Sequence, residues 1–112
     1  MSYRSDTALW IVQRASAAVL AVCVVVHLVT IVYAVRGGLT AAEILGRTRG
    51  NVAWLAFYSL FVLAVAVHAP IGLRPVMAEW LGWRGRSRDL CVLLFALLLA
   101  WMGMRAMLVL FL

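Results

Sequence analysis

The sequence predicts an all-α membrane protein with three transmembrane helices, over about residues 8–35, 52–74 and 89–111. Hydrophobic residues fill 67% of the 112 positions, charged residues fill 12%, and the mean hydropathy is +1.07. These values lie far outside the range of soluble globular proteins. Three spans of about 20 residues and two connections account for the chain. We therefore expect a single membrane-anchor domain over residues 1–112.

The first predicted span follows a short polar lead and begins near Trp10, an aromatic residue of the kind found at membrane interfaces. Arg14 lies about one turn inside, and residues 15–35 carry no charge. This apolar run is too long for the core of a signal peptide, and no convincing small-residue cleavage site accompanies it. We expect it to be a membrane span.

Turn and cap signals separate the first span from the second. Residues 36–38, Arg-Gly-Gly, break the first helix, and Thr40 with Glu43 has the spacing of a capping box, which predicts a short interfacial helical turn. Asn51 is the predicted N-cap of the second span. Pro70 removes a backbone hydrogen bond within that span, so we expect a bend near its C-terminal end.

The connection before the third span is aromatic and basic, and Ser87 is the predicted N-cap of that span. The net charge of +6 comes from ten arginines and no lysine, placed at span ends rather than in one stripe, which argues against nucleic-acid binding. By the positive-inside rule, the N-terminus is predicted to lie in the cytoplasm and the chain to cross the lipid bilayer of the cytoplasmic membrane. Arginines near the N-terminus and in the second connection outnumber those in the first connection, six to three: Arg4, Arg14, Arg74, Arg84, Arg86 and Arg88 against Arg36, Arg47 and Arg49.

Two histidines lie within the predicted spans, His27 in the first and His68 in the second. An ionisable side chain is costly in hydrocarbon without a partner, so each is a candidate functional residue, and a metal is the obvious partner for His68. Small residues one turn to either side of His68, Ala64 and Gly72, would let a flat macrocycle approach the backbone. A polar stripe follows the His27 face of the first helix: Gln13, Ser16, Cys23 and Thr30.

These features also have structural interpretations without a ligand. Either histidine could form a hydrogen bond across a helix interface, the polar stripe could be ordinary helix contact, and Gly72 could be a packing notch. Arg105 in the third span more often extends to the membrane surface than binds a ligand. If these structural interpretations hold and neither histidine binds a metal, the chain is a small helical membrane protein without a redox function, such as a transporter subunit or an assembly factor. We keep this as the alternative to a metal-binding function.

Part of the second span resembles a known haem-b motif. His68, Gly72, Leu73 and Arg74, followed by Glu79, are similar to the pattern His-x-x-x-Gly-[Ile/Leu]-Arg in the cytochrome b subunit of succinate dehydrogenase and fumarate reductase. The resemblance covers almost the whole chain, as three spans in matching order.

The start of the first span also resembles this family, in which an arginine is followed two positions later by a serine, here Arg14 and Ser16. Three positions depart from the pattern. Gln13 stands where many relatives have histidine, Trp10 where a serine is credited with quinone binding, and Pro75 where histidine is common. These changes affect a detailed quinone site more than the haem assignment.

The resemblance implies a membrane anchor that binds haem b in a succinate:quinone or quinol:fumarate oxidoreductase and carries electrons between an iron–sulfur subunit and quinone. The implied partners are a flavoprotein subunit, the iron–sulfur subunit and a second membrane-anchor subunit, which would complete a helical bundle of which this chain forms half. His68 would be an axial ligand, and Arg14 would contact a haem propionate or, with Gln13, the quinone. No nucleophile with a base and no carboxylate cluster is evident, so dicarboxylate chemistry must belong to another chain.

The depths of the two histidines bear on the number of haems. With the N-terminus inside, His27 lies ~3 to 7 Å outward of the middle of its span and His68 ~8 Å inward. We expect two b haems, with His68 on the inner and His27 on the outer, the opposite ligands coming from a partner; a single haem is the alternative. Ser16 and Gly72 are expected beside the cofactor. Haem propionates prefer guanidinium partners, and the candidates are Arg14, Arg74 and Arg105.

Overall fold

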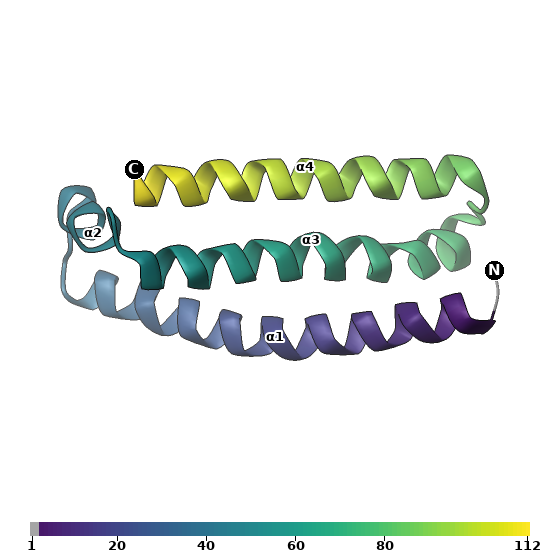
Figure 1. The fold of residues 1–112 in the computed structure, drawn as a ribbon, viewed down its shortest axis with the longest axis horizontal. Coiled ribbons are helices and arrows are strands. Elements are labelled where there is room, and N and C mark those ends of the chain that lie inside the picture. The colour runs from purple at the N-terminus through teal and green to yellow at the C-terminus, as the bar shows by residue number, and fades with distance from the viewer. Residues whose placement is uncertain (1–2) are drawn as a thin grey trace.

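The computed structural model describes residues 3–112 and contains the helices α1 (Tyr3–Arg36), α2 (Ala41–Thr48), α3 (Val52–Leu81) and α4 (Arg86–Phe111). Figure 1 shows α1, α3 and α4 side by side, with α3 in the middle and each long helix antiparallel to the next. The start of α1 and the α3–α4 turn lie at one end of the bundle, here called the N-terminal end. The short α2 and the C-terminus lie at the other, the α2 end. Within residues 3–112, three helices are long and apolar enough to cross a membrane, which confirms the predicted fold class.

Both side-chain caps predicted between the first two spans are present. Thr40 Oγ1 accepts a hydrogen bond from the backbone N–H of Glu43 at 3.2 Å and thereby begins α2. Asn51 Oδ1 accepts hydrogen bonds from the backbone N–H groups of Ala53 and Trp54, at 3.0 and 3.4 Å. These bonds satisfy donors that have no partner within the first helical turn, so both helices begin where the sequence predicted.

The α2 segment is joined by hydrogen bonds to the last turn of α4. Thr48 Oγ1 donates a hydrogen bond to the carbonyl oxygen of Leu110 at 2.8 Å. The backbone N–H of Gly50 donates to the carbonyl oxygen of Phe111 at 2.9 Å. The last carbonyls of a helix lack partners within it. The α2 end therefore supplies two donors that the C-terminal end of α4 needs.

The second helix is longer than the predicted residues 52–74, because α3 continues through Pro70 and Pro75 to Leu81. Each proline removes one backbone hydrogen bond, but a membrane helix tolerates this loss where neighbouring helices support it. Pro70 is buried, as is Met77 beyond it. The helix ends at Gly82, whose φ of 64° is left-handed and whose backbone N–H donates to the Met77 carbonyl oxygen.

The other two long helices begin earlier than predicted. α1 begins at Tyr3 instead of near residue 8, and Asp6 in its first turn complements the positive end of the helix dipole. The predicted cap of α4 is wrong: the N-cap is Gly85, and Ser87 lies inside the helix. The Ser87 hydroxyl instead accepts a hydrogen bond from Trp83 Nε1 at 2.7 Å.

Buried side chains in the bundle are mostly small, and most large apolar side chains are exposed along the three long helices. A Cβ added to Gly103 on α4 would lie 2.7 Å from Cγ1 of Val62 on α3, so these backbones approach closely. Close approach at small residues is typical of membrane helices, which gain no hydrophobic driving force from one another in lipid. The exposed apolar faces are suited to lipid and to further membrane helices. The buried apolar residues are Cys23, Ala64, Met77, Ala78 and Val92.

Candidate functional site

Ser16 on α1 and His68 on α3 lie opposite each other toward the N-terminal end of the bundle. Ser16 Oγ is 3.4 Å from His68 Nδ1, and it donates a hydrogen bond to the backbone carbonyl of Gln13 at 3.1 Å. A serine hydroxyl has one proton to donate and can also accept. Because its proton points to Gln13, the Ser16 oxygen can accept the Nδ1 proton of His68. The neutral imidazole then keeps its free lone pair on Nε2.

The side chain of Gln13 occupies the notch at Gly72, one turn from His68. A Cβ added to Gly72 would lie 2.9 Å from Gln13 Nε2, and Gln13 Oε1 is buried without a hydrogen-bond partner in the described part of the chain. The structure thus brings four predicted site residues together, namely Gln13, Ser16, His68 and Gly72. It uses the space at Gly72 for contact between α1 and α3, where the sequence suggested room for a macrocycle.

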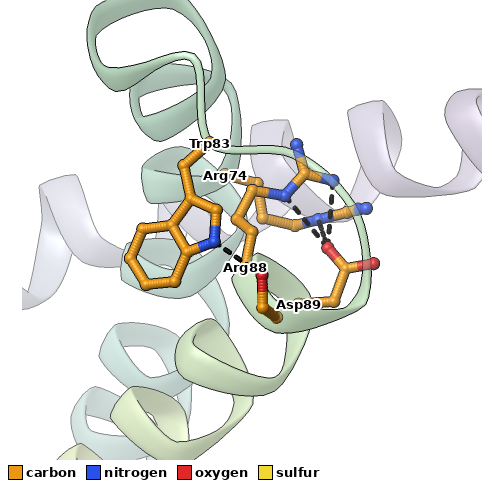
Figure 2. Close-up of polar contacts among 5 residues, drawn as sticks. Arg74, Trp83, Arg88 and Asp89 are labelled. Atoms are coloured by element: carbon orange, nitrogen blue, oxygen red, sulfur yellow. Dashed lines mark hydrogen bonds and ion pairs between the residues drawn. The ribbon is translucent and has the colours of Figure 1, made fainter.

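The two arginines predicted near His68 each have a different neighbour. The exposed Arg14 guanidinium lies over the ring of Trp10, 5.1 Å from the ring centroid. Arg74 Nε lies 3.2 Å from Asp89 Oδ1, and Arg88 Nη2 lies 2.9 Å from the same oxygen. Figure 2 shows both guanidinium groups converging on this carboxylate. Asp89 therefore links the C-terminal part of α3 to the first turn of α4.

Sequence reasoning assigned no role to Asp89. Its position directly after Arg88, at the start of an apolar run, was the available signal. Glu79, the acid in the motif, is exposed near the end of α3. It belongs to the charged lining of a cavity of about 400 Å³ at the N-terminal end, formed by Asp6, Arg74, Pro75, Ala78, Glu79, Arg84 and Arg88.

His27 lies between α1 and α3 in an aromatic setting. Its ring meets those of Tyr58 and Phe61 nearly edge-on, with centroid distances of 5.8 and 5.5 Å. Its Nδ1 atom is buried and has no hydrogen-bond partner among residues 3–112. His27 also lines two cavities, of about 760 Å³ toward the α2 end and about 460 Å³ beside α3 and α4.

The two histidines lie at different depths in the bundle. His68 is level with Ser16 on α1, whereas His27 lies eleven residues further along that helix, a distance of about 16 Å at 1.5 Å per residue. The neighbours of His27 on α3, Tyr58 and Phe61, likewise precede His68 by two to three turns. One iron cannot be held between imidazoles this far apart, because metal–nitrogen bonds measure about 2 Å.

Arg105 is not brought to His27. Its guanidinium lies over the ring of Trp101, 5.1 Å from the centroid, and the residue is exposed. The cavity beside α3 and α4 is lined instead by other α4 residues, including Met102, Gly103 and Ala106. The structure supports extension of Arg105 along the outer surface of α4.

The fold and site define a helical membrane protein with three spans and histidines at the interface between two of them. The chain matches, over residues 1–104, the family described as succinate dehydrogenase/fumarate reductase transmembrane subunit. It belongs to this family, which confirms the resemblance drawn from the haem-like motif, and it is a multi-pass membrane subunit of a succinate dehydrogenase or fumarate reductase complex. No curated protein and no solved structure gives a significant match.

Proposed function

We propose that the chain binds haem b within the membrane and carries electrons between an iron–sulfur subunit and a membrane quinone. The observation that carries this proposal is the contact of His68 Nδ1 with the Ser16 hydroxyl, 3.4 Å apart. With the imidazole proton on Nδ1, Nε2 is the lone-pair nitrogen of a half-buried side chain in a membrane span. A metal-binding histidine typically has this arrangement, with its second ring nitrogen held by a protein group.

The residues around His27 also fit a haem. Its Nδ1 atom is buried without a partner among the described residues, and a buried polar atom without a partner is costly in apolar surroundings. His27 also lines two cavities. Because His27 and His68 differ in depth, each would hold its own haem, with a further ligand from a second membrane-anchor subunit.

A b haem held by histidine would supply one-electron transfer. The chain's own residues would position the group and neutralise its propionates. Arg14 is exposed, with a cation–π contact to Trp10, so its guanidinium is available to a propionate or to quinone. The unpartnered Oε1 of Gln13 is an acceptor at the same end of the bundle. Arg74 is the second guanidinium there, although Asp89 competes for it.

The expected docking surface for the iron–sulfur subunit is the N-terminal end, which would face the cytoplasm. The arginine count supports this orientation, since six arginines belong to this end and three to the first connection. The flavoprotein would bind beyond the iron–sulfur subunit and carry out the dicarboxylate chemistry, for which this chain has no suitable residues.

The proposal is tested by a reduced-minus-oxidised visible spectrum of the purified complex from the wild type and from His68→Leu. We expect the variant to be inserted in the membrane but to lose the low-spin b signal of the inner haem, because one Fe–N bond depends on this side chain. Val67→Leu, at the exposed neighbouring position, is the matched control and should keep the full signal. An undiminished signal in His68→Leu would show that His68 is only a hydrogen-bonding residue between helices.

A further inference from the structure

The Ser16 hydroxyl donates a hydrogen bond within its own helix. Ser16 is 8% exposed, and its proton is donated to the Gln13 carbonyl oxygen on the preceding turn of α1. This geometry makes the serine oxygen an acceptor toward α3. Because the position is buried, little solvent is present to replace the hydroxyl if it is removed.

His68 needs such an acceptor if it is to bind iron. A neutral imidazole carries its proton on one ring nitrogen and its lone pair on the other, and the position of the proton follows from the hydrogen bond that fixes it. In the described part of the chain, the hydrogen-bond contact of the His68 ring is with Ser16 of α1.

We propose that Ser16 is the positioning residue for His68, accepting the Nδ1 proton so that α1 sets both the tautomer and the ring orientation that present Nε2 to iron. This inference rests on the proposed haem binding. It gives α1 a direct influence on the inner haem without contact between Ser16 and the iron. An acceptor at the second nitrogen raises the basicity of a ligating imidazole, and a more basic ligand favours the ferric state.

The test is a potentiometric titration of the inner haem in the intact purified complex, with wild type, Ser16→Ala and Ser16→Thr. Second partners of metal-bound histidines typically contribute about 10- to 100-fold to affinity, and for a hydroxyl at 3.4 Å we expect the low end. A tenfold loss of affinity confined to the ferric state in Ser16→Ala corresponds to a potential about 59 mV higher for one electron. Ser16→Thr retains a hydroxyl and should restore a potential near that of the wild type.

Ser59→Ala is the matched control. It removes a hydroxyl from α3 that also contacts another helix, since Ser59 Oγ lies 2.9 Å from Met107 Sδ. In the described part of the chain this hydroxyl bonds to Leu55 and Met107 and forms no hydrogen bond with either histidine. We expect it to leave the potential of the inner haem unchanged. Loss of the haem in Ser16→Ala, with retention in Ser16→Thr and Ser59→Ala, would equally support the proposal.

Three results would overturn the role of Ser16: an unchanged potential in Ser16→Ala, the same shift in Ser16→Thr as in Ser16→Ala, or the same shift in Ser59→Ala. These results are distinguishable from failure of the haem assignment. If His68→Leu lacks the inner haem while Ser16→Ala keeps the wild-type potential, haem binding stands and only the positioning role is wrong.

Discussion

Gly103 on α4 packs directly against Val62 on α3, and a Cβ added to this glycine would lie 2.7 and 2.8 Å from the two methyl carbons of the valine. Valine in a helix has one strongly preferred rotamer and cannot turn aside. Gly103→Ala should therefore push the two helices apart and destabilise the bundle by about 1–3 kcal/mol. The measurement is the thermal midpoint of the purified complex in detergent, which should fall.

The same substitution at Gly72 provides the comparison. There the added Cβ would meet only Nε2 of Gln13, the end of a flexible side chain, so Gly72→Ala should lower the midpoint less than Gly103→Ala does. The double variant Gly103→Ala/Val62→Ala should recover part of the loss, because the clash is removed. Equal effects of the two glycine substitutions would contradict the close approach of α3 and α4.

Thr48→Val should loosen the α2 end of the bundle. The substitution preserves the shape of the side chain but removes the donor to the Leu110 carbonyl oxygen, a 2.8 Å hydrogen bond from a residue that is 8% exposed. Loss of one such bond typically costs about 1 kcal/mol. Hydrogen exchange should become faster in the last turns of α4 and remain unchanged near its start at Arg86. If the last turns of α4 exchange at the same rate in Thr48→Val as in the wild type, this role of α2 is contradicted.

Much of this fold was predicted from interactions between residues that lie only a few positions apart in the sequence. The caps at Thr40 and Asn51 follow from side chains that bond to backbone groups two or three positions away, so the sequence alone contains both partners. The helix ends were predicted less well. α3 continues past Pro75, which a membrane helix tolerates where neighbouring helices pack against it. α3 packs against both α1 and α4, and no local sequence pattern reveals this packing.

In the candidate site, too, relationships within one helix were predictable and contacts between helices were not. The 3.6-residue period places Ser16 and His27 on one face of α1, but it does not say which α3 residue faces each. The structure pairs Ser16 with His68 and surrounds His27 with Tyr58 and Phe61, because antiparallel packing reverses the order of residues along α3. The ion pair of Arg74 with Asp89 likewise joins two helices, so spacing within one helix could not reveal it.

Reversing the charge of the α3–α4 turn should weaken assembly with the soluble subunits. The changes are Arg84→Glu, Arg86→Glu and Arg88→Glu, made together. Complementary charge mainly steers association, while exposed aromatic residues such as Trp80, 82% exposed, would provide buried area. We expect less iron–sulfur and flavoprotein subunit to co-purify with the variant.

The control for this experiment reverses three arginines at the α2 end: Arg36→Glu, Arg47→Glu and Arg49→Glu. Both triple variants change the net charge equally, so a general charge effect would appear in both. A reporter fused to the C-terminus would show whether either variant has changed its topology. Unchanged topology and unchanged co-purification in the α3–α4 turn variant would exclude docking at this end.

His27→Leu should lower the haem content of the intact complex from two to one, because His27 and His68 lie at depths that no single iron can join. The haem that remains should be the one lost in His68→Leu. Thr30→Val is the matched control: Thr30 lines the same cavity as His27, but its hydroxyl donates only to the His27 backbone carbonyl, at 2.7 Å. This control should keep both haems. A wild-type complex with one haem, retained after His27→Leu, would mean that the edge-on contacts with Tyr58 and Phe61 are the whole role of His27.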